Sequence, residues 1–281
     1  MILVLGSTGT TGGEVARQLI AAGRQPRLLV RSHEKARAFQ DDAELVEGDL
    51  DRPESIEVAM RGVEAMYLVS SGVRGRTQEI AAIDAAKRAG VRHVVKLSVY
   101  GADAPFYAIA RWHAEVESHL KGSGLAWTML RPVNFMTNSL QWADSIRSSG
   151  AFYQPTGDGG WAAIDPADIG AVAVRTLTSP GHEGKAYAMT GPEALSASQY
   201  AQKISAAIGK PVAFVDVPPE AAHDQLLKSG MPTEYVDALL DLLAAMKAGK
   251  LDVVGDGVER ATSRKPVGFD DWIRRNAAAF R

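Results

Sequence analysis

Three glycines follow one another at three-residue spacing in the segment GSTGTTG near the start of the chain. The segment consists of Gly6, Ser7, Thr8, Gly9, Thr10, Thr11 and Gly12. Backbone N–H groups and hydroxyls gathered at a tight turn suit the binding of phosphate oxygens. We expect Gly6 to allow the turn, Gly9 to let a pyrophosphate approach the backbone, and Gly12 to let a helix pack closely. An ordinary glycine-rich turn is the alternative.

The elements on either side of this segment bear on the choice between the two interpretations. Residues 2–5 form an apolar run that is typical of a strand buried on both faces. Residues 14–22 have helical periodicity, and Gly23 is placed to end that helix. The order of strand, glycine turn and helix favours a nucleotide-binding loop, because a helix N-terminus offers free N–H groups and a partial positive charge to phosphates.

Two basic residues follow the next predicted strand, which covers residues 27–30. Arg31 and Lys35 come where a dinucleotide-binding unit meets the adenosine ribose. An acidic residue there suits the 2′-hydroxyl of NAD, whereas Arg suits the 2′-phosphate of NADP. The sequence therefore predicts a preference for NADP, with a merely solvated charge as the alternative.

Predicted strands at residues 43–46, 65–69, 93–97 and 126–130 alternate with helices along the first half of the chain. Asp51 is predicted to cap the helix that begins near Pro53. This alternation predicts an α/β fold, a Rossmann-type doubly wound parallel sheet. Open sheets of this kind bind ligands at the carboxyl ends of their strands. The cofactor-binding residues expected there are Val69, Ser70, Ser71, Ser98, Pro132, Val133, Asn134 and Phe135. Those expected to border the nicotinamide and its ribose are Ser70, Ser71, Pro132, Asn134 and Phe135.

The helix predicted from about residue 106 carries a titratable pair on one face. His113 and Glu117 are four residues apart and therefore neighbours on the helix surface. They lie beside a stripe that is predicted to be buried and consists of Ile109, Trp112, Val116 and Leu120. His113 is the candidate catalytic residue, and a half-buried histidine hydrogen-bonded to Glu117 is the alternative.

The segments GSTGTTG, RWHAEVESHL, SGLAWTMLRP and NFMTN resemble the NmrA-like branch of the atypical short-chain dehydrogenases/reductases, and the resemblance covers essentially the whole chain. It implies bound NADP(H), with Asp49 and Leu50 near the adenine. It also implies that His113 stands where plant members have a lysine. The usual Tyr-x-x-x-Lys pair is absent, and Tyr107 and Arg111 share its spacing by coincidence.

This branch contains quinone, triphenylmethane-dye, azo-dye and isoflavone-type reductases, as well as transcriptional co-regulators without catalysis. The resemblance implies an NADPH-dependent reductase that transfers hydride to a quinone-like or other conjugated aromatic acceptor. An NADP-sensing regulatory protein is the alternative. A sugar-nucleotide epimerase is disfavoured by the missing Tyr-x-x-x-Lys pair.

The chain is expected to divide into a cofactor-binding core, residues 1–155, and mainly a small C-terminal substrate lobe, residues 156–281, with residues 185–189 returning to the sheet. A loop is predicted over residues 150–161 and a helix from Asp165 onward. Residues 234–246 form an amphipathic helix that serves as core or pocket wall. The residues expected to bind the acceptor are Phe135, Met136, Asn138, Trp142, Tyr153 and Trp161.

The composition limits the remaining function classes. The 281 residues include no cysteine and give a formal net charge of −2, so thiol chemistry is excluded and a nucleic-acid-binding surface is disfavoured. No run approaches the length of a membrane span. We expect a cytoplasmic monomer or homodimer with a small-molecule aromatic acceptor as partner, no direct binding to nucleic acid or membrane, and no metal site.

Overall fold

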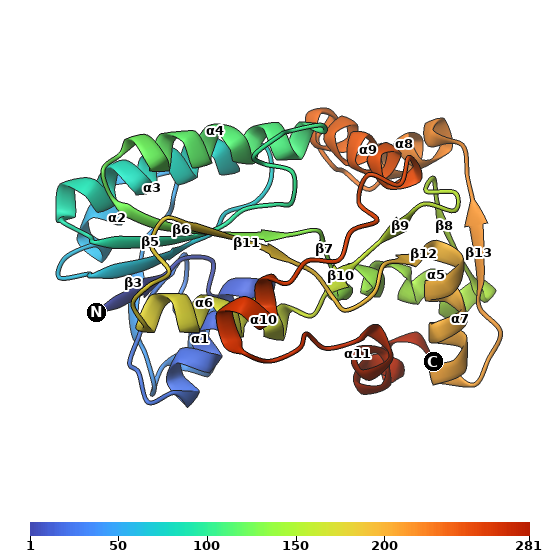
Figure 1. The fold of residues 1–281 in the computed structure, drawn as a ribbon, viewed down its shortest axis with the longest axis horizontal. Coiled ribbons are helices and arrows are strands. Elements are labelled where there is room, and N and C mark those ends of the chain that lie inside the picture. Colours follow the sequence, from blue (N-terminus) through green and yellow to red (C-terminus); the bar gives the residue numbers. More distant parts are fainter.

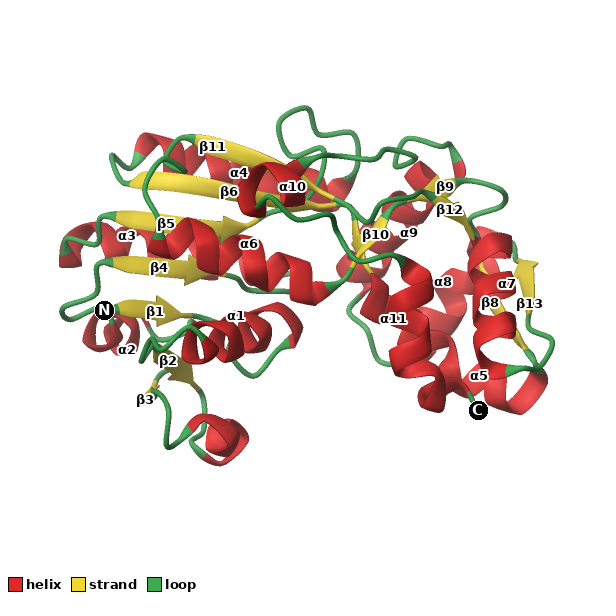
Figure 2. Ribbon diagram, turned by 60° about the horizontal axis from the view of Figure 1, so that its bottom comes forward, coloured by secondary structure: helices red, strands yellow, loops and turns green.

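A seven-stranded parallel sheet forms one half of the molecule in the computed structural model, which describes Met1 to Arg281 apart from the side chain of Pro53. The strand order is β11-β6-β5-β4-β1-β2-β3 (Figures 1 and 2). The strands are β1 (Ile2–Val4), β2 (Arg27–Val30), β3 (Glu44–Glu47), β4 (Ala65–Leu68), β5 (His93–Leu97), β6 (Ala126–Pro132) and β11 (Lys185–Met189). The predicted doubly wound sheet is confirmed, including the return of residues 185–189.

Helices cover both faces of the sheet (Figure 1). One face carries α2 (Pro53–Ala59), α3 (Gly75–Ala89) and α4 (Ala108–Gly122). The opposite face carries α1 (Thr10–Ala21), α6 (Pro166–Thr178) and α10 (Gly257–Thr262). Each layer has its own apolar core, with Leu3 and Met66 on the first side and Val4 and Tyr67 on the second, because neighbouring residues of a strand point to opposite faces.

A smaller lobe lies beyond the carboxyl ends of the strands (Figure 2). Its helical segments are η2 (Met136–Trp142), α5 (Ala143–Ser149), α7 (Ala197–Ile208), α8 (Pro219–Lys228), α9 (Thr233–Lys247), α11 (Phe269–Asn276) and η3 (Ala277–Phe280). Its strands are β7 (Asn134–Phe135), β8 (Ala151–Gln154), β9 (Gly160–Trp161), β10 (Ala163–Ile164), β12 (Leu195–Ser196) and β13 (Ala213–Asp216). Aromatic stacking orders its core, for example Trp142 on Phe152 with ring centroids 4.1 Å apart.

The chain passes between the two halves more than once. Segments before residue 155, such as α5 and β8, lie in the lobe, whereas α6 and α10 pack on the sheet and β11 is its edge strand (Figure 2). The division into residues 1–155 and 156–281 remains a proposed one, with these elements interleaved.

Three local predictions were wrong. Residues 150–161 include β8 and β9 rather than a continuous loop, because β8 pairs with the distant β13. The first helix begins at Thr10 rather than at residue 14. Arg52 occupies the N-cap position of α2, and the Asp51 carboxylate instead forms an ion pair with Arg74 at 2.8 Å and accepts a hydrogen bond from Gln78.

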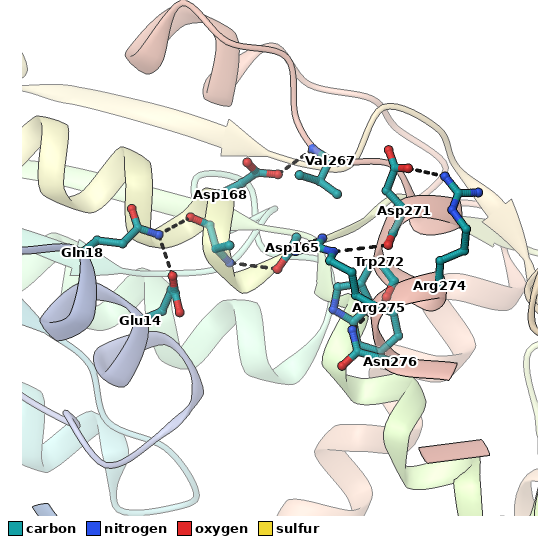
Figure 3. A network of polar contacts seen from close by, with 11 residues as sticks. Glu14, Gln18, Asp165, Asp168, Val267, Asp271, Trp272, Arg274, Arg275 and Asn276 are labelled. Carbon is teal, nitrogen blue, oxygen red and sulfur yellow. Dashed lines mark hydrogen bonds and ion pairs between the residues drawn. The ribbon is translucent and has the colours of Figure 1, made fainter. Parts of the chain in front are cut away.

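The first turn of α6 joins the lobe to the sheet (Figure 3). The carboxylate of Asp165 accepts a hydrogen bond from the Ala167 N–H, as the sequence predicts for an N-cap, and its other oxygen lies 2.7 Å from Arg275 on α11. Asp168 accepts a hydrogen bond from the Val267 N–H, and Gln18 on α1 donates to the Ala167 carbonyl. The start of one helix thus fixes both α1 and the C-terminal segment.

Two kinds of feature are missing from the described part of the chain. None of its helices has the length and apolar character needed to cross a membrane. Its His, Asp and Glu side chains form no group of three or more that is placed to hold a metal ion.

Two histidines at the amino ends of the strands, His182 buried and His93 partly buried, predict a pH-dependent stability. His93 Nε2 lies 2.9 Å from Thr128 Oγ1, and His182 Nδ1 lies 2.7 Å from the Tyr187 hydroxyl. Burial lowers the pKa of both below the usual 6.5. Below that pH the unfolded chain binds protons that the folded chain does not, so we expect the free energy of unfolding to fall by at most about 1.4 kcal/mol per pH unit for each histidine.

Urea denaturation at pH 7.5, 6.5 and 5.5 measures this dependence. The His182→Gln variant should have a shallower slope, and His33→Gln, which changes an exposed side chain, is the control. A free energy of unfolding that stays constant across this range would contradict the expectation.

Candidate cofactor cleft and acceptor pocket

The glycine loop joins β1 to α1 with almost no space around two of its glycines. Gly6 has φ +62°, in the left-handed region that favours glycine. A Cβ on Gly12 would lie 2.3 Å from the Gly6 carbonyl oxygen, which confirms that Gly12 allows close packing of the helix. Gly9 is the N-cap of α1 and provides no capping side chain, so first-turn N–H groups remain open to a ligand.

A cleft of about 450 Å³ opens in front of this loop, at the carboxyl ends of β1, β4 and β5. The predicted cofactor residues in its lining are Gly6, Gly9, Thr10, Thr11, Gly12, Val69, Ser70, Ser71, Ser98 and Phe135. The lining also contains His113, the candidate catalytic residue, together with Ile109 and Trp112. Ile109 and Trp112 belong to the stripe that was predicted to be buried, but they are only partly buried because this end of the stripe faces the cleft.

Two buried hydroxyls in this region fit a polar ligand. Ser7 Oγ and Ser70 Oγ are enclosed, and neither has a hydrogen-bond partner among the described residues. Ser70 lines the cleft, whereas Ser7 lies in the glycine loop just behind the lining. Buried polar groups are normally paired, so an unpaired hydroxyl at a ligand cleft is a place where a ligand or water oxygen completes the bonding. The Ser70 hydroxyl and the open N–H groups of α1 suit the diphosphate and ribose of a dinucleotide.

The remaining predicted cofactor residues lie outside the cleft lining. Thr8, Arg31 and Lys35 are exposed, and neither basic side chain forms a hydrogen bond or ion pair with the described residues. Asp49 and Leu50 follow β3 and are partly buried, with Asp49 Oδ1 accepting from the Asp51 N–H. Pro132 and Val133 are buried, and Asn134 lines a second cavity. Their roles remain predictions.

The second cavity, of about 480 Å³, lies in the lobe. All six residues predicted to bind the acceptor line it: Phe135, Met136, Asn138, Trp142, Tyr153 and Trp161. The stripe of α9 forms another wall, with Leu239, Leu242 and Leu243, as expected for a pocket wall. Phe135 and Tyr235 line both cavities, so the cleft and the pocket meet at these two rings.

The expected alternative for His113, a hydrogen bond to Glu117, was wrong. His113 Nδ1 lies 3.0 Å from Nζ of Lys96, the penultimate residue of β5. Glu117 instead accepts from Ser98 Oγ at 2.7 Å and forms a double hydrogen bond with Arg131. Burial opposes its ionised form, but Arg131 and Ser98 hold the pKa of Glu117 below its usual value.

Tyr107 and Arg111 have structural partners, in agreement with the view that their spacing is a coincidence. The buried Tyr107 hydroxyl donates to the Tyr100 carbonyl at 2.7 Å, and Arg111 forms an ion pair with Asp241 of α9. Neither side chain lines the cleft. The site therefore contains no tyrosine–base pair from these residues.

Sequence reasoning missed the buried pair of Lys96 and Glu79, whose Nζ and Oε2 are 2.7 Å apart. One signal was available, because a charged residue inside the apolar run HVVKL of a central strand must find a partner. The identity of that partner, on α3, was not contained in any local pattern. Arg76 and Tyr235 were missed as cleft residues for the same reason.

Comparison with known proteins gives a consistent result. Residues 6–180 match the family model described as NAD(P)H-binding. The chain is 42% identical to NAD(P)H azoreductase of Xenophilus azovorans, covering 100% of this chain and 99% of that protein. It is 38% identical to (4-alkanoyl-5-oxo-2,5-dihydrofuran-3-yl)methyl phosphate reductase of Streptomyces griseus, covering 100% and 99%. The NADPH complex of the quinone oxidoreductase QOR2 of Escherichia coli superimposes with a TM-score of 0.89 at 28% identity, covering 98% and 99%.

Substitutions at Gly9 and Gly12 should have different effects, because Gly9 has space around it and Gly12 has almost none. A Cβ on Gly9 would meet only the Gly6 carbonyl oxygen, at 3.3 Å, so Gly9→Val should fold and yet fill the space in front of the α1 N-terminus. We expect it to lose NADPH binding in a fluorescence titration while its circular dichroism spectrum is retained. Gly12→Ala is the matched comparison and should lower the melting temperature, because overpacking typically costs about 1–3 kcal/mol. Normal NADPH binding by a well-folded Gly9→Val protein would contradict the assignment of the loop.

Proposed function

We propose that this chain is an NADPH-dependent reductase of uncharged conjugated aromatic acceptors such as quinones. The premise is that the chain belongs to the NAD(P)H-binding NmrA-like family of atypical short-chain dehydrogenases/reductases. One observation carries the proposal. A cleft built on a glycine loop meets an apolar, aromatic pocket at Phe135 and Tyr235. Two ligands bound in these cavities would touch at that junction, as hydride transfer requires.

The residues proposed to hold the cofactor come from three places. The glycine loop and the α1 N-terminus would bind the diphosphate, and Arg31 with Lys35 would bind the 2′-phosphate. Asp49 would accept a hydrogen bond from the adenine amine. The nicotinamide cofactor, when bound, supplies the hydride, and the protein supplies orientation and exclusion of water.

The acceptor pocket has no charged side chain among the described residues that line it. Its walls are aromatic and aliphatic, and its polar groups are neutral amides and hydroxyls, including Asn138, Gln154 and Gln225. Moving a sulfonate or phosphate into such a pocket would leave a charge without a partner, which is costly. A flat, uncharged ring system gains instead from contact with Trp142 and Trp161.

The chemistry of the cleft favours an acceptor that stabilises its own reduced anion. Tyr107 and Arg111 are committed to structural contacts, so they provide no acid for an alkoxide. A quinone or azo compound spreads the added electron pair over a conjugated system and takes its proton from water. An aliphatic ketone does not, and we expect it to react poorly. The phosphate-bearing furan named for the Streptomyces relative would need a cation that this pocket lacks in its described lining.

Cofactor preference tests the assignment of Arg31. A charge-assisted contact to phosphate contributes about 1.5–3 kcal/mol, or roughly ten- to a hundredfold in affinity. We expect NADPH to bind more tightly than NADH by that factor and Arg31→Ala to remove most of the difference. Arg37→Ala, which alters another exposed arginine on the nearby 3-10 segment η1 (Glu34–Phe39), is the control. Equal affinities of the wild-type protein for the two cofactors would overturn the assignment.

An acceptor series tests the pocket. With NADPH as the reductant, we expect the protein to reduce 1,4-naphthoquinone and to show an at least about tenfold lower kcat/KM for its 2-sulfonate. Aliphatic ketones should cause little oxidation of NADPH. Gln225→Lys places a cation at the pocket wall on an exposed residue of α8, and should raise kcat/KM for the sulfonate selectively. A preference for the sulfonate or for ketones in the wild-type protein would contradict the acceptor class. Tight NADPH binding without turnover of any acceptor would favour the sensor alternative.

A further inference from the structure

A lysine lies fully enclosed near the carboxyl end of β5, where an apolar residue would be expected. Lys96 has 0% exposure and makes three contacts through Nζ. They go to Glu79 Oε2 at 2.7 Å, to the Leu97 carbonyl at 3.0 Å and to His113 Nδ1 at 3.0 Å. Glu79 is itself 2% exposed, and its other oxygen accepts from the Ser70 N–H at 3.0 Å.

The contacts of Lys96 fix the direction of each hydrogen bond. A lysine ammonium has three donors and no acceptor, and here each donor faces one partner. His113 Nδ1 must therefore accept, which means that it carries no proton. In a neutral imidazole the single proton then lies on Nε2. The tautomer follows from the count of donors, provided that Lys96 is charged beside Glu79.

The other nitrogen of His113 is available to a ligand. Nε2 makes no hydrogen bond with the described residues, and the half-buried imidazole lines the cleft on α4. Phe135 and Tyr235, where the cleft meets the acceptor pocket, line the same cavity. A donor placed there faces the region where an acceptor oxygen would lie.

We propose that Lys96 and Glu79 are positioning residues that hold His113 as the neutral Nε2–H tautomer, so that His113 donates a hydrogen bond to the acceptor oxygen and does not act as a charged acid. The inference rests on the proposed function, because it assigns roles within the same site. A neutral donor polarises a carbonyl and stabilises the anion that forms, while the product proton comes from water.

The electrostatics of the cleft agree with a neutral imidazole. Burial and the neighbouring Lys96 charge lower the pKa of His113 well below its usual value. The charged groups around the ring are Lys96 on β5, Glu79 and Arg76 on α3, and Glu117 one turn along α4. Glu79 is paired with Lys96, Arg76 with Glu115, and Glu117 with Arg131, so each carboxylate that could stabilise an imidazolium already has a cation.

The tautomer can be read directly, without turnover. In ¹⁵N-histidine-labelled protein without cofactor, the His113 signals are assigned by their loss in His113→Asn. We expect a protonated Nε2 and an unprotonated Nδ1 throughout pH 5.5–8. A protonated Nδ1, or titration to imidazolium near pH 6.5, would overturn the proposal.

The positioning role is tested by changing the pair. Lys96→Met with Glu79→Gln removes both charges and keeps an amide oxygen for the Ser70 N–H, which avoids an isolated buried charge. We expect mixed His113 tautomers and a kcat with 1,4-naphthoquinone reduced about fivefold to tenfold, with the NADPH dissociation constant unchanged within about twofold. A second pair variant, Lys96→Gln with Glu79→Gln, also carries no charge and serves if the first does not fold; it should show the same tautomer mixing, because a glutamine amide at position 96 can either donate to Nδ1 or accept from it.

His119→Gln is the control for both variants. His119 lies on α4, as His113 does, but outside the cleft lining, and the substitution changes only its contact with Asp84 on α3. It should leave the His113 tautomer and kcat unchanged. A pure Nε2–H signal with unaltered kcat in the folded pair variants would show that Lys96 and Glu79 are only structural. A failure of the proposed function can be told apart from a failure of this proposal. In that case the wild-type protein would show the expected His113 tautomer and yet reduce no acceptor.

Discussion

The fit of the first turn of α1 against the end of β1 is the constraint on which the rest of the structure depends. Gly12 lies so close to the Gly6 carbonyl that a methyl group would overlap it. A second glycine, Gly170 of α6, faces Gln18 and Glu14 from the other side, and a Cβ at this position would lie 2.8 Å from either side chain. Held between the two, α1 keeps its N-terminus directed at the carboxyl edge of the sheet, where the cleft opens.

The position of the lobe follows from the same helix pair. The first turn of α6 receives a side chain from α1 and, through Asp165, the Arg275 guanidinium of α11 (Figure 3). The helix that packs against α1 is thereby also the helix that holds the C-terminal segment. Phe135 leaves the sheet at β7, and Tyr235 approaches on α9, which brings the two cavities together.

Charge is distributed very differently in the two cavities. The cleft offers N–H groups, hydroxyls and a network in which the buried cation of Lys96 is matched by Glu79. The pocket is uncharged in its described lining. The cleft therefore suits a polar, phosphate-bearing ligand and the pocket a flat apolar one, and the His113 imidazole lines the cleft together with the two rings at the junction. Its state is set by a lysine seventeen residues earlier in the sequence, across the sheet–helix interface.

The sequence by itself determined the features that depend on neighbours along the chain. The strand–glycine–helix unit, the Asp165 N-cap and the sheet strands at residues 27–30, 93–97 and 185–189 were all predictable, because turns, caps and periodicity are local properties. The wall residues of the acceptor pocket followed from their aromatic character and their place after a strand end.

Only the tertiary structure decided which distant groups meet. Residues 151–154 form a strand because β13 lies beside them. His113 contacts Lys96 instead of Glu117, because β5 passes beneath α4 and because Arg131 and Ser98 already form hydrogen bonds with Glu117. Helical spacing placed His113 and Glu117 on one face, yet the stronger partners came from other elements. Pairing of charges depends on three-dimensional distance and burial, and neither is written in the spacing of residues along one helix.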